Sequence, residues 1–91
     1  MKHYKSNYMV KLFKILGNQN RLRILQILEQ NKEKPLTVNE LTEQMSISQG
    51  TLSTHLAKMR AHGVIKAKQS RQCMYYSIKD ENALKFVRMV E

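Results

Sequence analysis

Short polar side chains without charge gather at one place in the chain. Residues 48–55 read Ser-Gln-Gly-Thr-Leu-Ser-Thr-His. Their hydroxyl and amide groups donate and accept hydrogen bonds, as base edges in a major groove do, and Gln pairs bidentately with adenine. A merely solvated helix face more often carries pairs of Glu and Lys. The segment is therefore a candidate for reading bases, and we expect base contacts from Gln49, Thr51, Ser53 and Thr54.

The positive charge is concentrated in two stretches that contain no acid. The 91 residues include 16 Lys and Arg against 7 Asp and Glu, a net charge of +9. Neither 1–28 nor 46–79 contains an acid, and each has six Lys or Arg. Such an excess favours polyanions, nucleic acid above all, although charge alone equally fits a solvated basic surface.

Basic residues follow the polar segment and complete a candidate DNA site. Ser48 is expected to cap a helix whose free backbone amides suit a phosphate. Arg71, at the tip of a predicted hairpin, is suited to a narrow minor groove, where negative potential is strongest; an ordinary solvated turn is the alternative. Phosphate contacts are expected from four further residues: His55, Lys58, Arg60 and Lys68.

Other chemistry finds little support in the sequence. The single cysteine, Cys73, excludes an intramolecular disulfide, and its neighbour Arg71 would lower the thiol pKa if the two side chains met. The three histidines are scattered, which argues against a metal site. No Ser-His-Asp order, phosphate-binding loop or acid pair in the acid-free half appears, so we expect no enzyme and no cofactor.

Apolar residues recur at helical spacing in the first third of the chain. They predict a helix over about 7–16, closed by Gly17 in the left-handed conformation, and a second helix capped by Asn20. A polar linker ending at Pro35 follows. The residues at this spacing are Met9, Leu12, Phe13 and Leu16 in the first helix, and Leu22, Ile24, Leu25 and Leu28 form a broad apolar face on the second.

The middle of the chain predicts a helix-turn-helix. Thr37 and Glu40 have the spacing of a capping box, which begins a short third helix. A turn at 46–48 follows, and Ser48 caps a fourth helix that ends at Gly63. This helix turns Leu52, Leu56 and Met59 inward, and helical periodicity then places the polar residues outward.

The last third changes to strand periodicity and then back to a helix. Residues 64–68 and 73–78 predict a two-stranded hairpin around a tip at 69–72. Asp80 caps a last helix that carries Leu84, Val87 and Val90 on one stripe, with Phe86 beside it. The order of four helices, hairpin and helix predicts an α+β winged helix-turn-helix fold in one domain, 1–91.

The order and spacing of these segments resemble the ArsR family of bacterial repressors over nearly the whole chain. Residues 16–25 are similar to the family's L-x-x-x-x-R-L-x-I-L segment, and 48–56 resemble its recognition helix, S-Q-x-x-x-S-x-H-L. Residues 63–65 and 75–78 resemble its wing strands. The resemblance implies a homodimer joined through the first and last helices. It also implies repression at a palindromic operator on double-stranded DNA, released by an inducer, and a DNA contact from His55.

The chain departs from the metal-sensing pattern of that family. Thr37-Val38-Asn39 stands where many members have Cys-x-Cys, and Asn82 replaces the His of an Asp-x-His pair. The usual glycine of the wing is replaced by Arg71. These departures predict a regulator without the family's usual metal ligands.

Two alternatives remain open at this stage. One is a sensor of the same fold that responds to a metal or, through Cys73, to an oxidant. The other is a winged-helix protein-interaction module without DNA contact. The chain has no signal-peptide core and no apolar run long enough for a bilayer, so we expect a cytoplasmic protein with no membrane contact.

Overall fold

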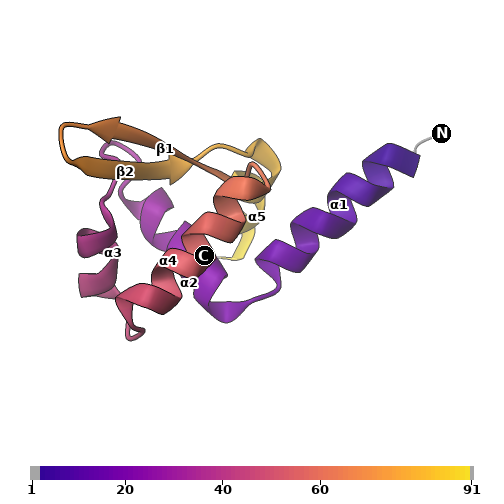
Figure 1. Ribbon diagram of the computed structural model, residues 1–91. Helices are drawn as coiled ribbons and strands as arrows, with labels where there is room; N and C mark the ends of the chain where they lie inside the picture. The colour runs from indigo at the N-terminus through magenta and orange to yellow at the C-terminus, as the bar shows by residue number, and fades with distance from the viewer. Residues whose placement is uncertain (1–2, 91) are drawn as a thin grey trace.

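The computed structural model describes residues 3–90, with side chains from residue 7 onward. The elements follow the predicted order of four helices, a hairpin and a helix (Figure 1). They are α1 (His3–Leu16), α2 (Gln19–Gln30), α3 (Val38–Gln44), α4 (Gln49–Ala61), β1 (Ile65–Ser70), β2 (Cys73–Ile78) and α5 (Glu81–Val90). The winged helix-turn-helix arrangement predicted from the sequence is confirmed.

α1 lies largely outside the packed body of the protein. In Figure 1 its N-terminal part projects away from the other helices, and only its C-terminal part joins them. The helix begins at His3, four residues before the predicted start. Its buried side chains are Leu12, Ile15 and Leu16, whereas Phe13, which shares the helical spacing of the apolar residues, is 53% exposed.

The junction between α1 and α2 differs from its prediction in two ways. Gly17 does not adopt a left-handed conformation, since the positive-φ residues among those described are Gly63 and Arg71. A Cβ at Gly17 would lie 3.1 Å from the backbone oxygen of Phe13, and this close approach favours glycine. The N-cap of α2 is Asn18 and not Asn20, because its side chain accepts a hydrogen bond from the Arg21 backbone N–H at 3.0 Å.

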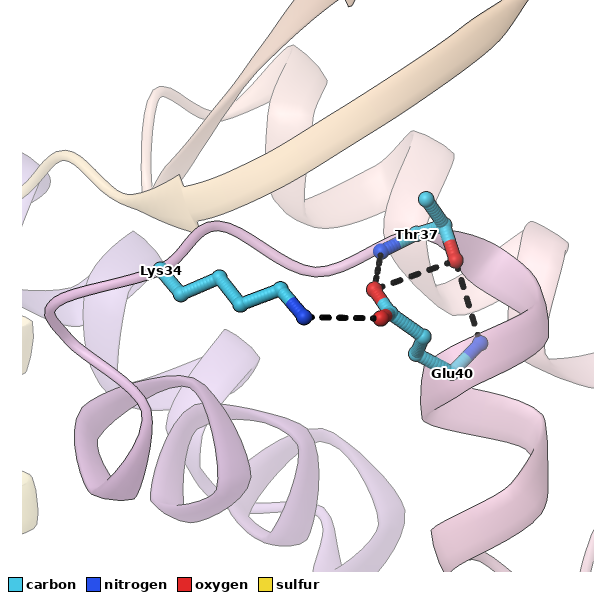
Figure 2. A network of polar contacts seen from close by, with 3 residues as sticks. All are labelled: Lys34, Thr37 and Glu40. Atoms are coloured by element: carbon cyan, nitrogen blue, oxygen red, sulfur yellow. Dashed lines mark hydrogen bonds and ion pairs between the residues drawn. The ribbon is translucent and has the colours of Figure 1, made fainter.

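The capping box at the start of α3 is present as predicted (Figure 2). The Glu40 N–H donates to Thr37 Oγ1 at 3.1 Å, and the Thr37 N–H donates to Glu40 Oε1 at 2.9 Å. Lys34 Nζ lies 3.4 Å from Glu40 Oε2. The backbone hydrogen bond lowers the pKa of the Glu40 carboxyl, with a smaller contribution from Lys34. These contacts fix where α3 begins.

The wing is an antiparallel hairpin that is also joined to the loop before α3. β1 pairs with β2 from Ile65 opposite Ile78 to Ser70 opposite Cys73. Leu36 exchanges two backbone hydrogen bonds with Tyr76, at 3.1 and 2.7 Å. β2 has its predicted bounds, whereas β1 reaches two residues closer to the tip than predicted, so the tip is a two-residue turn at 71–72 instead of 69–72.

The tip is closed by a residue in an unusual conformation. Arg71 has φ 58°, in the left-handed region that glycine adopts without steric cost. A non-glycine residue there costs about 1 kcal/mol or more. The loss of the family's glycine therefore leaves the hairpin intact but introduces local strain.

α5 packs on the body of the protein through part of its apolar stripe. Asp80 caps it as expected, with Oδ1 accepting from the backbone N–H groups of Asn82 and Ala83 at 2.8 and 2.9 Å. Ala83 and Val87 are buried, whereas Val90 is 44% exposed. The C-terminal end of the stripe therefore lies on the surface of this protomer.

Candidate nucleic-acid interface

α4 separates its apolar and polar side chains as the sequence predicted. Leu52, Leu56 and Met59 are at most 1% exposed and belong to the hydrophobic core. The predicted base-reading residues are all exposed: Gln49, Thr51, Ser53 and Thr54. The N-terminal half of α4 therefore presents amide and hydroxyl groups on an open surface.

Internal hydrogen bonds leave the Thr51 hydroxyl as a donor and the Thr54 hydroxyl as an acceptor toward an external group. Ser48 caps α4 by accepting from the Thr51 N–H at 3.1 Å, and its own hydroxyl donates to Thr51 Oγ1 at 3.0 Å. Thr51 thus keeps its hydroxyl proton to donate outward. Thr54 Oγ1 donates to the Gly50 carbonyl at 3.0 Å, which leaves its lone pairs to accept. The surface offers a donor and an acceptor about one helical turn apart.

His55 lies at the inner border of this surface. It is half-buried, and its Nδ1 is 3.4 Å from Nη1 of Arg21. Burial lowers the pKa of the His55 imidazole, and the positive charges of Arg21 and Lys58 lower it further. The neutral ring is therefore favoured near pH 7.

Arg21 is a buried charged residue at the meeting point of three helices. Only 8% of it is exposed. Its Nε donates to the Ile15 carbonyl at 2.7 Å, and its Nη2 donates to the Lys14 carbonyl at 3.0 Å. Both carbonyls belong to the last turn of α1, where helical partners are missing. The guanidinium thus caps α1 from α2 while it faces His55 on α4.

Apart from the half-buried His55, the expected phosphate contacts are exposed and free of ion pairs, and so is the expected minor-groove contact. Lys58, Arg60, Lys68 and Arg71 are all exposed. The ion pairs found among residues 7–90 are Lys34 with Glu40 and Arg88 with Glu29, and neither includes a predicted site residue. The basic groups near α4 and the wing therefore remain open to an external anion.

Cys73 lies close to the predicted site, in a hollow that Gln49 of α4 also lines. It is exposed, and it lines this hollow of about 250 Å³ together with Gln49, Gln72 and Thr37.

In the described part of the chain, no three His, Cys, Asp or Glu side chains gather as metal ligands. No helix among those described is long and apolar enough to cross a bilayer.

Sequence reasoning missed two polar links between helices. One is the capping role of Arg21, which the sequence shows only as one base among many. An Arg shortly after a helix end is a weak signal for such back-capping. The other joins α1 to α5, where Tyr8 donates to Asp80 Oδ2 and accepts from Asn82 Nδ2 at 3.2 Å. No local pattern predicts this second link, since it spans more than seventy residues.

Proteins described as transcriptional regulators are similar to most of the chain. HlyU of Vibrio cholerae serotype O1, a transcriptional activator, is 36% identical over 69 residues, which cover 76% of this chain and 61% of that protein. The match therefore spans less than two thirds of HlyU. The crystal structure of HlyU from Vibrio vulnificus CMCP6 superposes with a TM-score of 0.83 at 31% identity, over 98% of this chain and 90% of that one.

A second solved structure and a family model agree with these relatives. The transcriptional repressor PagR of Bacillus anthracis gives a TM-score of 0.87 at 27% identity, over 98% of this chain and 99% of that one. The model of bacterial regulatory proteins of the arsR family matches residues 18–67, from the cap of α2 into β1. The chain therefore belongs to the arsR family of bacterial regulatory proteins and has the winged helix-turn-helix fold of these solved structures.

Proposed function

We propose that the protein is a homodimeric repressor that places α4 of each protomer in the major groove of a palindromic operator. The observation that carries this proposal is the division of α4 into a buried leucine side and an exposed side of amides and hydroxyls. A major groove distinguishes base pairs by fixed patterns of donors and acceptors, which such groups match. Two recognition helices about one helical turn of DNA apart would read the two half-sites.

Each site residue has a distinct part in this proposal. The residues that read or orient on bases are Gln49, Thr51, Ser53 and Thr54. Ser48 and the free backbone amides at the start of α4 suit a phosphate. Further phosphates are bound by His55, Lys58, Arg60 and Lys68. Arg71 enters the adjacent minor groove, since the turn at the wing tip exposes it beyond the strands.

We propose that α1 and α5 form the dimer interface. Large apolar side chains stand exposed on both helices: Val10 and Phe13 on α1, at 51% and 53%, and Met89 on α5, at 80%. Val10 and Phe13 are three residues apart and share one side of α1. A second copy of the chain would bury these groups, and it would also cover the part of α1 that projects from the body in Figure 1.

The dimer is tested by the mass of the protein in solution. Phe13→Asp should convert the dimer to monomer in sedimentation equilibrium, because a carboxylate would be placed in an apolar interface. Gln30→Asp, a new carboxylate at an exposed position on α2, is the matched control and should remain dimeric. A dimer that survives Phe13→Asp would place the interface elsewhere.

DNA recognition is tested by selecting duplexes with the purified protein and comparing two variants on them. Thr54→Ala should change the preferred sequence, because it removes an acceptor that faces the groove. Lys68→Ala should weaken all duplexes alike and reduce the slope of log K against log salt by about 1.8 for a dimer, or about 0.9 per lost phosphate contact. Normal binding by both variants would refute the site assignment.

The cellular part of the proposal is repression in the cytoplasm, relieved by a small-molecule inducer. It rests on the relationship to the arsR family and on the absence of metal-ligand clusters from the described residues. A reporter gene behind the selected operator should be silenced by the protein. Activation of the reporter would refute repression and indicate that the protein is an activator.

A further inference from the structure

His55 in α4 and His62, the C-cap of the same helix, are held in opposite tautomers by their neighbours. Nδ1 of His62 lies 2.9 Å from the Lys58 carbonyl, which only accepts, so this nitrogen must carry the proton. Nδ1 of His55 faces Nη1 of Arg21 at 3.4 Å. A guanidinium only donates, so Nδ1 of His55 must be the unprotonated nitrogen and Nε2 must carry the proton.

The free nitrogen of His55 is open to solvent. Nε2 has no hydrogen-bond partner within the described residues, where the contact to Arg21 is made by Nδ1. No buried side-chain nitrogen or oxygen in that part of the chain lacks a partner. Nε2 therefore cannot be buried, although the ring as a whole is half-buried. The ring has one nitrogen fixed from inside and one facing outward.

We propose that Arg21 is a positioning residue for DNA recognition, which holds His55 as a neutral ring that offers the duplex a fixed Nε2–H donor. This inference rests on the proposed function. The charged groups that act on the ring are Arg21 of α2 and Lys58 of its own helix, both positive. Arg21 is itself held in place by the last carbonyls of α1. A proton on Nδ1 would be driven against the guanidinium.

The consequence for function is specific. A histidine that binds phosphate as a cation gives tighter DNA binding as the pH falls through its pKa. His55 held by Arg21 should add no such dependence near neutral pH. It acts as a donor of constant character, and its direction is set by α2 and by the end of α1.

The first test needs no DNA and observes the imidazole nitrogens directly. Long-range ¹H–¹⁵N NMR of the wild-type protein should show Nδ1 of His55 without a proton and Nε2 with one, whereas His62 should show the reverse. The titration midpoint of His55 should lie below the ordinary value of about 6.5. A proton on Nδ1 of His55, or a midpoint at or above the ordinary value, would overturn the inference.

The second test replaces the ring by amides that imitate one nitrogen each. The amide of Gln reaches the place of Nε2, and the amide of Asn reaches only the place of Nδ1. On the selected duplex, His55→Gln should retain most of the affinity, whereas His55→Asn should bind roughly tenfold more weakly. Equal affinities of the two variants would overturn the inference. Both variants leave Arg21 in place, so neither disturbs its contacts with α1.

The third test compares affinity at pH 8.0 and 6.5 in three proteins. Wild type and His55→Gln should give nearly parallel profiles, since the lowered pKa of His55 keeps its ring mostly neutral down to the lower pH, and this comparison cancels the other histidines. Arg21→Met should depart from them and gain roughly twofold at the lower pH, because the released ring charges more readily and meets the phosphate as a cation. A wild-type profile that departs from His55→Gln would overturn the inference. Absence of any salt-dependent duplex binding by wild type would instead refute the proposed function and leave the NMR result unaffected.

Discussion

Replacing Arg21 by Met should destabilise the protein far more than a change of an exposed charge on α2. The side chain is only 8% exposed and donates to two carbonyls of α1, at 2.7 and 3.0 Å. Hydrogen bonds from a charged donor contribute about 1.5–3 kcal/mol each, and Met restores the volume but neither bond. The two carbonyls at the end of α1 then lose their partner. Two such bonds correspond to about 3–6 kcal/mol, and removal of the desolvation penalty of the buried guanidinium offsets part of this, so we expect a loss of roughly 2–4 kcal/mol in the free energy of unfolding.

The measurement is urea denaturation at equal protein concentrations, because dimerisation makes stability depend on concentration. Arg23→Met is the matched control, since Arg23 is exposed on the same helix two residues away. It should change the free energy by no more than about 0.5 kcal/mol. For a domain of this size, the loss at Arg21 corresponds to a fall in Tm of roughly 10–25 °C. Equal midpoints for the two variants would refute the reasoning that the guanidinium holds α1 to the body.

Three further predictions concern the framework around α4. Thr37→Ala should cost about 1 kcal/mol through the lost cap of α3. Glu40→Gln should make the free energy of unfolding fall less steeply with decreasing pH in the acid range. The pKa of the Glu40 carboxyl is lowered in the folded protein, so the wild-type carboxylate stabilises the fold above its unfolded pKa near 4.5, and this contribution is lost as the pH falls from there through the folded pKa. Leu56→Ala, at a position 1% exposed, should cost 2–5 kcal/mol by the usual cavity penalty, which differential scanning calorimetry would register. A Thr37→Ala variant of unchanged stability, an unchanged fall of the free energy of unfolding with acid pH in Glu40→Gln, or a Leu56→Ala loss below about 1 kcal/mol would each contradict its prediction.

The parts of the fold that the sequence predicted are those governed by contacts within a few residues. The capping box joins Thr37 to Glu40, three positions apart, and the two sides of α4 follow from the helical period alone. Asp80 likewise caps α5 through the next few backbone N–H groups. Such features depend little on the rest of the molecule, so the candidate base-reading surface was found from residue types and spacing.

The parts that the sequence did not predict depend on distant packing or on conformations that local preference disfavours. Phe13 has the spacing of an inward residue, but the body of the protein reaches only one side of α1. Arg71 takes the positive φ that its residue type avoids, because the pairing of β1 with β2 extends to the tip. Arg21 and His55 are 34 positions apart in the chain, and no periodic pattern in the sequence indicates their contact.

The placement of Arg21 explains why folding and recognition cannot be fully separated in this protein. Its guanidinium completes the end of α1, the helix proposed for dimerisation, and faces His55 on the helix proposed for DNA reading. A change at Phe13 should act on the proposed dimer alone, and a change at Lys68 on the proposed phosphate contact alone, because both side chains are exposed. A change at Arg21 alters the anchoring of α1 and the tautomer of His55 together. The two effects remain distinguishable, because helix anchoring changes the stability of the protein and the tautomer changes the pH dependence of DNA binding.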